Sequence, residues 1–229
     1  MPPMGSHPDW PAVISPLRTR LPDYGWTTLS IQLPALRADA GVGEYVPLFP
    51  AARARIAAAV DLLQQRGAHN IVLVGYGLGA LMGADFLAEQ GGTAGVTALV
   101  AVSMVSYPDL DPGLNAAKLI EKVPVPILDI YASRDLDAVL DFNTARTRAA
   151  RIAAAAAAAS NDVGAYLDST TAQPGLYGTP GHIAYRQIGL AGTDHGYSGL
   201  EASLVKRIAG WMNHHARGVE KNTLADPKQ

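Results

Sequence analysis

Short apolar runs alternate along the chain with longer segments of helical spacing. This alternation predicts βαβ units and a parallel sheet with helices on both of its faces. The run Asn70–Val74 is apolar at consecutive positions, which is typical of a strand that is buried on both sides. The expected strands are Thr27–Leu33, Asn70–Val74, Thr97–Met104, Pro126–Tyr131 and Tyr185–Leu190.

Apolar residues three or four positions apart predict the helices between these strands. The segment 136–160 is rich in alanine and strongly helix-forming. Its arginines, Arg146, Arg148 and Arg151, are expected on the solvated face of that helix. The expected helices are 10–21, 51–66, 80–90, 136–160 and 200–211. The fold class that follows is a three-layer α/β sandwich with a mainly parallel sheet.

The length of 229 residues fits a single α/β domain, which we expect over residues 1–216, with a charged C-terminal tail at 217–229. A hydrophobic fraction of 48% and a charged fraction of 17% indicate a globular, soluble protein. The net charge of −2 gives no reason to expect nucleic acid as a partner. No signal peptide or membrane-spanning run is recognised, and the compartment stays open between cytosol and periplasm. The lack of cysteine excludes disulfides and thiolate catalysis.

The most specific local feature is the glycine-rich turn Gly75-Tyr76-Gly77-Leu78-Gly79 between an apolar strand and a helix of small residues. It resembles the nucleophile elbow, G-x-S-x-G, of the α/β-hydrolase family. The outer glycines stand where that family needs them, but Gly77 occupies the position of the catalytic serine. Glycine has no side chain and cannot form an acyl-enzyme. The resemblance therefore implies the scaffold of a hydrolase with a vacant nucleophile position.

Two downstream loops resemble the rest of the family pattern. Asp135 follows the strand 126–131, where the family carries its catalytic acid, and Asp137 is a second candidate. His195 follows the last expected strand, where the family carries its catalytic base. The order of elbow, acid and histidine is also the hydrolase order. The resemblance thus implies that Asp135 and His195 form an acid–base dyad.

An oxyanion hole is a further implication of the resemblance. One donor would be the backbone N–H of Leu78, and the loop 3–7 matches the source of the other, which makes Gly5 and Ser6 candidates. Tyr76 is another pocket candidate, although its side chain should point away from the apex of the turn.

In the family, a strand precedes this oxyanion loop, and here that strand would lie before Met1. The N-terminal strands are therefore expected to be missing or reduced. Either upstream residues are absent from the sequence, or the strand 27–33 pairs directly with the strand 70–74.

A dinucleotide-binding turn is the alternative interpretation of these glycines. It requires G-x-G-x-x-G near the first strand and an acidic residue after the next strand. The spacing here differs, and the next strand ends in Val102-Ser103. The resemblance to α/β hydrolases spans residues 7–216. It is similar to an uncharacterised bacterial α/β-hydrolase-like family, through His7–Pro11, the elbow and the Asp194-His195 loop.

Three functions are compatible with the missing serine. A pseudoenzyme would bind a small or lipid-like ligand or a protein partner. A carboxylic-ester hydrolase would need another serine as its nucleophile. A dyad enzyme would use His195 and Asp135 to activate water or to remove an acidic substrate proton. The serines that are candidates by their loop or strand-end position are Ser6, Ser103, Ser106, Ser133 and Ser198.

No metal or nucleotide cofactor is expected. His214 and His215 are adjacent on a helix and point in different directions, so we expect a solvated helix end and no metal site. A lid over the site would be drawn from one of the loops 35–50, 107–122 or 168–182.

Overall fold

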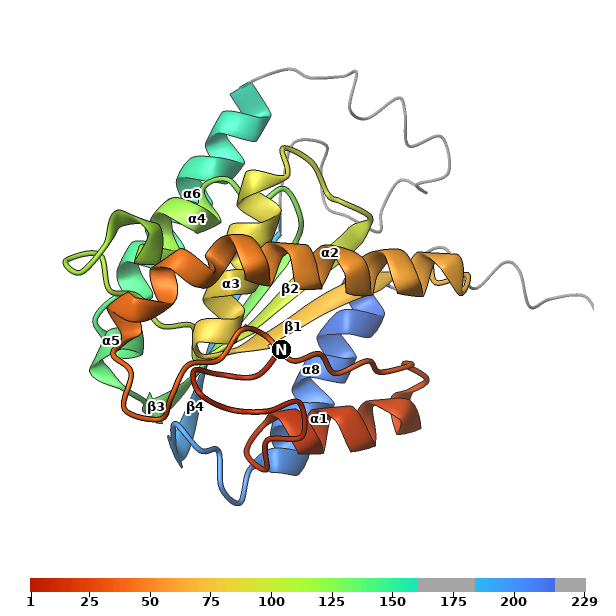
Figure 1. Ribbon diagram of the computed structural model, residues 1–229. Coiled ribbons are helices and arrows are strands. Elements are labelled where there is room, and N and C mark those ends of the chain that lie inside the picture. The colour runs from red at the N-terminus through yellow and green to blue at the C-terminus, as the bar shows by residue number, and fades with distance from the viewer. Residues whose placement is uncertain (160–183, 217–229) are drawn as a thin grey trace, which may run out of the picture.

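The computed structural model describes residues 1–159 and 184–216, and in this part of the chain it contains a parallel sheet of four strands (Figure 1). The strands are adjacent in chain order, β1-β2-β3-β4. Because they run in the same direction, their carboxyl ends meet at one edge of the sheet. Their bounds are β1 Ile71–Tyr76, β2 Val96–Val102, β3 Ile127–Arg134 and β4 Tyr185–Asp194.

Helices cover both faces of the sheet, which confirms the expected three-layer α/β sandwich (Figure 1). One face packs against α2 (Phe49–Gln65), α3 (Leu78–Glu89), α4 (Ala116–Ile120) and α6 (Asn143–Ala159). The other face packs against α1 (Ile14–Arg20) and α8 (Glu201–His215). The short helix α5 (Asp137–Leu140) follows β3, and three 3₁₀ segments span Leu21–Tyr24, Val42–Leu48 and Pro112–Leu114.

The strands β1 and β2 are almost wholly apolar because each one contributes to two cores. In β1, Ile71 and Leu73 lie in the core beneath α2 and α3, whereas Val72 and Val74 pack toward α1 and α8. Alternate residues of a strand point to opposite faces, so a strand with helices on both sides has no solvated face. Within the described residues, no helix combines the length and the hydropathy needed to cross a membrane.

The expected strand at 27–33 is not a strand, and its expected pairing with the strand 70–74 is wrong. The segment is irregular, and its backbone makes no hydrogen bond to β1 within the described residues. The Thr28 and Ser30 hydroxyls instead donate to the carbonyl oxygens of Arg18 and Pro8. Side-chain bonds to the N-terminal segment therefore hold this stretch away from the sheet.

Met1 occupies the place beside β1. Its nitrogen donates to the Val74 carbonyl oxygen at 2.9 Å, and its carbonyl oxygen accepts from the Tyr76 N–H at 3.2 Å. One residue that bonds to positions two apart on its neighbour follows the pattern of a parallel ladder. Met1 therefore extends the sheet by one residue beyond β1.

The long expected helix at 136–160 is divided into α5 and α6, and Arg146 is not solvated. Its side chain is fully buried and forms an ion pair with Asp129 of β3, with an N–O distance of 2.7 Å. Its other guanidinium N–H groups donate to the carbonyl oxygens of Met104 and Val139. A buried carboxylate in an apolar strand needs a partner, and Arg146 supplies it. The expected loop at 168–182 and the tail at 217–229 lie outside the described residues.

Candidate active site at the carboxyl ends of the strands

Gly77 is the apex of a sharp turn between β1 and α3, with φ 57° and ψ −123°. Positive φ costs glycine nothing, whereas it strains other residues. The flanking glycines are needed for a different reason, which is space. A Cβ on Gly75 would lie 2.4 Å from the Ala80 Cα, and one on Gly79 would lie 2.3 Å from the Pro2 carbonyl oxygen. The turn therefore has the steric requirements of an elbow at all three glycines.

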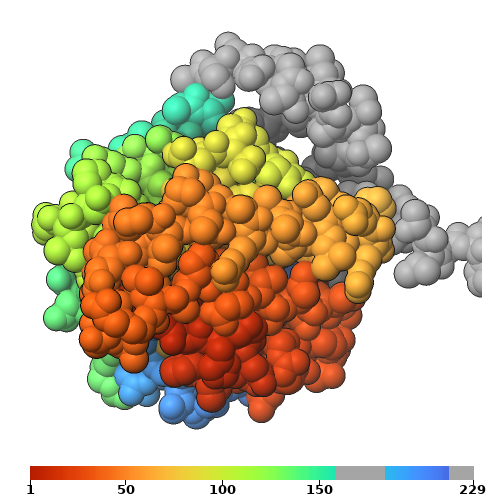
Figure 2. All heavy atoms as spheres, viewed as in Figure 1, coloured from red at the N-terminus to blue at the C-terminus, as the bar shows by residue number. Residues whose placement is uncertain are grey.

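The N-terminal segment covers the apex of this turn. A Cβ on Gly77 would lie 3.2 Å from the Pro3 Cβ, closer than an ordinary van der Waals contact. The Ser6 hydroxyl and N–H both donate to the Pro3 carbonyl oxygen and close a turn there. Figure 2 shows the N-terminal residues, in red, packed into this face of the molecule beside the orange α2 region. A side chain at position 77 would thus be in contact with Pro3.

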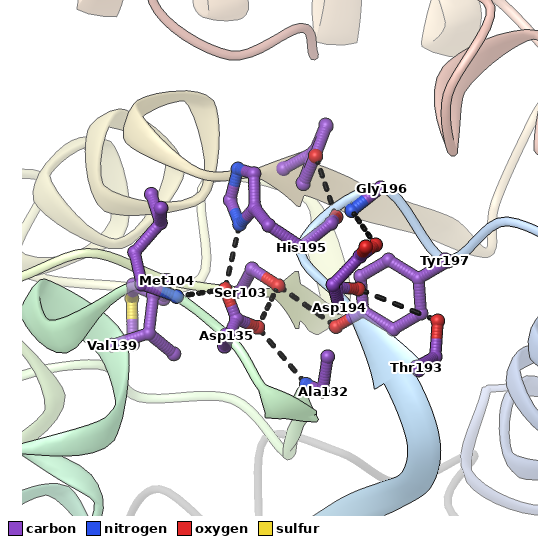
Figure 3. A network of polar contacts seen from close by, with 12 residues as sticks. Ser103, Met104, Ala132, Asp135, Val139, Thr193, Asp194, His195, Gly196 and Tyr197 are labelled. Atoms are coloured by element: carbon purple, nitrogen blue, oxygen red, sulfur yellow. Dashed lines mark hydrogen bonds and ion pairs between the residues drawn. The ribbon is translucent and has the colours of Figure 1, made fainter.

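Asp135 and His195 lie side by side, each directly after a strand, β3 and β4 respectively (Figure 3). The Asp135 Oδ1 and the His195 Nδ1 are 2.6 Å apart, within hydrogen-bond distance. The carboxylate is fully buried, whereas the imidazole is 28% exposed. This arrangement suits a carboxylate that orients a histidine. Asp137, the second acid candidate, lies exposed in the first turn of α5.

Hydrogen bonds saturate the Asp135 carboxylate (Figure 3). Its Oδ2 accepts from the Ser103 hydroxyl at 2.5 Å and from the Ala132 N–H at 2.9 Å, and its Oδ1 also accepts from the Leu136 N–H. Burial alone would raise the pKa of Asp135, but the bonds from His195, Ser103 and the two backbone N–H groups outweigh burial and lower it. The structure therefore holds this group as a carboxylate.

Ser103 directly follows β2, and its hydroxyl also lies 2.8 Å from the Tyr197 hydroxyl. Both residues have positive φ, 47° for Ser103 and 57° for Tyr197, which is unfavourable for residues with side chains. Such strain persists only where the surroundings impose it, and here both hydroxyls belong to the network around Asp135. The sequence named Ser103 only as a possible nucleophile, and its role beside the acid depends on a strand-end contact that no motif encodes.

The other candidate serines make no hydrogen bond to the histidine in the part of the chain that the structure describes. Ser106 is buried and accepts from the Ala116 N–H, and Ser133 accepts from the Gly192 N–H. Ser198 lies exposed on the loop after His195. Within the described residues, none of the five candidate hydroxyls hydrogen-bonds to His195.

Tyr76, the last residue of β1, supports the histidine. Its ring centroid lies 4.9 Å from that of His195, and its hydroxyl donates to the His195 carbonyl oxygen at 2.8 Å. Burial, with smaller contributions from Asp135 and Asp194, raises its pKa well above the usual range. Tyr76 therefore stays neutral and acts as a donor.

The residues that surround the apex bear on the expected oxyanion hole. Leu78 is buried as the first residue of α3, as an elbow donor would be. The residues that pack on the turn from the other side are Pro2 and Pro3, which have no backbone N–H to donate. Gly5 is exposed, and a Cβ there would lie 3.9 Å from the Tyr45 hydroxyl.

Two cavities of the protein lie away from this dyad. One, of about 480 Å³, is a groove beside the free edge of β1, lined by α1, α2 and residues 25–31. The other, of about 540 Å³, is a cleft between β4 and α8. Neither is lined by Gly77 or His195.

The fold and the order of elbow, acid and histidine along it define an α/β-hydrolase-like protein, and solved structures of that class are similar to it. Est1E from Butyrivibrio proteoclasticus has a TM-score of 0.60 at 12% identity, over 92% of this chain and 84% of that one. A protein of unknown function from Agrobacterium tumefaciens, described as a candidate α/β hydrolase, has a TM-score of 0.51 at 17% identity, over 93% and 83%. A candidate dienelactone hydrolase from Klebsiella pneumoniae has a TM-score of 0.50 at 14% identity, over 73% and 64%. At these identities the likeness is one of fold.

The chain belongs to the family described as Protein of unknown function (DUF3530), which it matches over residues 1–46 and 50–163. A search among curated proteins finds no significant match.

Proposed function

We propose that this protein is a pseudoenzyme, a relative of the α/β hydrolases that does not use serine catalysis. The observation that carries the proposal is the contact between Pro3 and the place of a side chain on Gly77. A hydrolase keeps that place open for its nucleophile and substrate. Here the residue type removes the nucleophile, and the N-terminal segment fills the space.

Residual activity would not contradict this proposal. The binding site and oxyanion hole of a triad enzyme still provide roughly 10³–10⁴-fold catalysis over water when a triad member is removed. Dedicated enzymes typically exceed that by several orders of magnitude. The measurement that matters is therefore how fast the protein hydrolyses an ester compared with a dedicated hydrolase, and not whether any hydrolysis is detected.

We assign this pseudoenzyme a binding role in the groove beside β1. The occupant that we propose is an extended polypeptide segment. Val74 and Tyr76 face this edge, since both bond to Met1, and Val72 faces it as well by alternation. In the described part of the chain, no backbone partner is seen for the Val72 N–H and carbonyl or for the Val74 N–H. An added parallel strand would satisfy these groups.

A lipid-like ligand suits the same groove less well. The lining is mostly apolar, from residues such as Leu17, Leu63 and Met212. An acyl chain would cover the free backbone groups of β1 without bonding to them. Each buried donor or acceptor left unpaired costs about 1–3 kcal/mol. An extended peptide pairs these groups and buries its own apolar side chains.

Proline at Val72 tests the strand-addition role. It removes the donor that faces the groove but no hydrogen bond to β2, whose ladder uses the alternate residues. A fluorescein-labelled hexapeptide of alternating valine and threonine should bind the protein and Val72→Ala but not Val72→Pro, as measured by anisotropy. If palmitate binds all three forms equally and the peptide binds none, the groove takes a lipid and strand addition is wrong.

A second candidate function is that of a dyad enzyme, favoured by the 2.6 Å hydrogen bond between Asp135 and His195. A buried carboxylate that orients a partly exposed imidazole can activate water without a covalent intermediate. The substrate class would be activated carboxylic esters. No other serine would take part.

A fluorophosphonate probe and a panel of p-nitrophenyl esters separate these functions, with His195→Ala as the control. The pseudoenzyme should remain unlabelled, and its ester hydrolysis should be equally slow with and without His195. Labelling of one serine would overturn it in favour of a serine hydrolase. Fast hydrolysis that His195→Ala abolishes, without labelling, would identify the dyad enzyme.

A further inference from the structure

A cleft of about 540 Å³ lies between the beginning of β4 and the outer side of α8. Arg186, the second residue of β4, lines one wall, and Lys206 and Arg207 line the other. His195 follows the opposite end of β4, so the cleft is separate from the candidate active site. The roles considered above for the elbow, the dyad and the β1 groove therefore give this cleft no function.

The charges of this cleft are all of one sign. Arg186, Lys206 and Arg207 contribute three permanent positive charges, and among the described residues no aspartate or glutamate lines the cleft. None of the three forms an ion pair with a carboxylate of residues 1–159 or 184–216. A protein of net charge −2 has carboxylates in excess, so this concentration of unpaired cations is a local feature.

Two residues that line the cleft, Trp211 and His215, contain buried ring nitrogens without a hydrogen-bond partner in the described part of the chain. These nitrogens are the indole Nε1 of Trp211, a residue that is only 7% exposed, and the Nδ1 of His215. The two rings stack with centroids 4.6 Å apart. An indole N–H can only donate, so Trp211 lacks an acceptor. The solvated helix end expected for His214 and His215 is therefore wrong for His215, which is half-buried against Trp211.

We propose that this cleft binds the phosphate group of a phosphorylated ligand. A phosphate dianion supplies several strong acceptors and enough negative charge to neutralise Arg186, Lys206 and Arg207. Guanidinium groups also match phosphate oxygens in geometry. Trp211 and Ile188 add an apolar surface against which a body attached to the phosphate can pack.

The same group could come from free phosphate or from a lipid headgroup, and titration calorimetry distinguishes these sources. The probes are inorganic phosphate and dihexanoyl phosphatidic acid below its micelle concentration, with dihexanoyl phosphatidylcholine as the neutral comparison. Both phosphate monoanion and dianion forms should bind more tightly at low salt. Tighter binding of phosphatidic acid would identify an amphiphilic ligand, and equal binding a small one; either result supports the site.

The charge-reversal double variant Lys206→Glu/Arg207→Glu should weaken phosphate binding by about tenfold or more, because it removes two cationic donors and places two negative charges beside the phosphate. Both residues are exposed on α8, so the fold should tolerate the change. The matched control is Arg148→Glu/Arg151→Glu on exposed positions of α6, across the sheet. Equal weakening in both double variants, or no binding of either phosphate probe at millimolar concentration, would overturn the proposal.

A second measurement does not depend on the double variant. The three tryptophans give three indole N–H signals in a ¹⁵N correlation spectrum, and Trp211→Phe assigns the one from the cleft. Phosphate should shift the Trp211 signal and leave those of Trp10 and Trp26 in place. A uniform shift of all three signals, or a Trp211 signal that does not move at saturation, would contradict binding in this cleft.

Discussion

Pro3 packs against the apex of the turn at Gly77, and its Cβ lies 3.2 Å from the position that a Cβ on residue 77 would occupy. The contact therefore connects two parts of the chain, the glycine at the apex of the turn and the N-terminal loop that packs against it. A residue of any size at position 77 must displace Pro3 or be held against it. A side chain at position 77 and the N-terminal segment would therefore compete for the same space.

Restoring the serine alone should not restore a reactive nucleophile. In Gly77→Ser, positive φ and contact with Pro3 should destabilise the fold by about 1–3 kcal/mol, and the hydroxyl should remain covered. The double variant Gly77→Ser/Pro3→Gly removes the cover and should react with a fluorophosphonate at residue 77. Mass spectrometry of the peptide that contains residue 77 measures the extent of labelling in the single and the double variant.

The control for this pair is the triple variant with His195→Ala, in which the label should be lost if the dyad activates the new serine. Full labelling of the Gly77→Ser single variant would show that Pro3 does not close the elbow, and the proposed pseudoenzyme would lose its main support.

The Ser103 hydroxyl should contribute to the charge state of Asp135. Its hydrogen bond is one of those that lower the pKa of this carboxyl against the effect of burial, so Ser103→Ala should raise that pKa. A hydrogen bond to a charged group is worth about 1.5–3 kcal/mol, which is the stability expected to be lost near pH 7. Urea denaturation over a range of pH measures it.

The sign of the pH dependence follows from the direction of the shift. A carboxyl with a lowered pKa in the folded state stabilises the fold above its unfolded pKa of about 3.9, and this stabilisation is lost as the pH falls through the lower folded value. The deficit of Ser103→Ala should therefore be largest above about pH 5 and shrink below about pH 4. Ser198→Ala, at an exposed hydroxyl, should show no such deficit; a deficit independent of pH would assign Ser103 a packing role only.

Arg146 should be far more important for stability than its exposed neighbours on the same helix. Arg146→Ala leaves Asp129 as a buried carboxylate without its ion pair, although Tyr185 and Gln187 still donate to it. Breaking a buried pair in this way costs about 3–5 kcal/mol. Arg148→Ala, at an exposed position, should change stability by less than about 0.5 kcal/mol. Similar denaturation midpoints for both variants would show that the buried pair is not needed.

The sequence identified the elements that depend on local patterns. Apolar runs predicted β1 to β4 within a few residues, and the spacing of Gly75, Gly77 and Gly79 predicted the turn, because periodicity and glycine are local signals. The loops that carry Asp135 and His195 follow from strand order alone.

The features that the sequence did not predict all join residues far apart in the chain. Nothing near Arg146 indicates that Asp129, 17 residues away, is its partner, and an arginine among alanines is typical of a solvated helix face. The contact of Met1 with β1 spans 73 residues. The segment 27–33 has the apolar content of a strand, but its hydroxyls bond elsewhere, which composition does not reveal.

A single methyl group added to α3 at Gly79 should disturb the packing of the N-terminal segment. A Cβ on Gly79 would lie 2.3 Å from the Pro2 carbonyl oxygen and 2.8 Å from that of Met1, and backbone atoms cannot give way as a flexible side chain can. Gly79→Ala should therefore destabilise the fold by about 1–3 kcal/mol, despite the higher helix propensity of alanine. Gly210→Ala is the matched control, because a Cβ on that glycine of α8 meets nothing within 4 Å. It should stabilise the fold by about 0.5–1 kcal/mol. Thermal unfolding of the two variants measures the difference, and a gain of stability in both would mean that Met1 and Pro2 do not pack on α3 in solution.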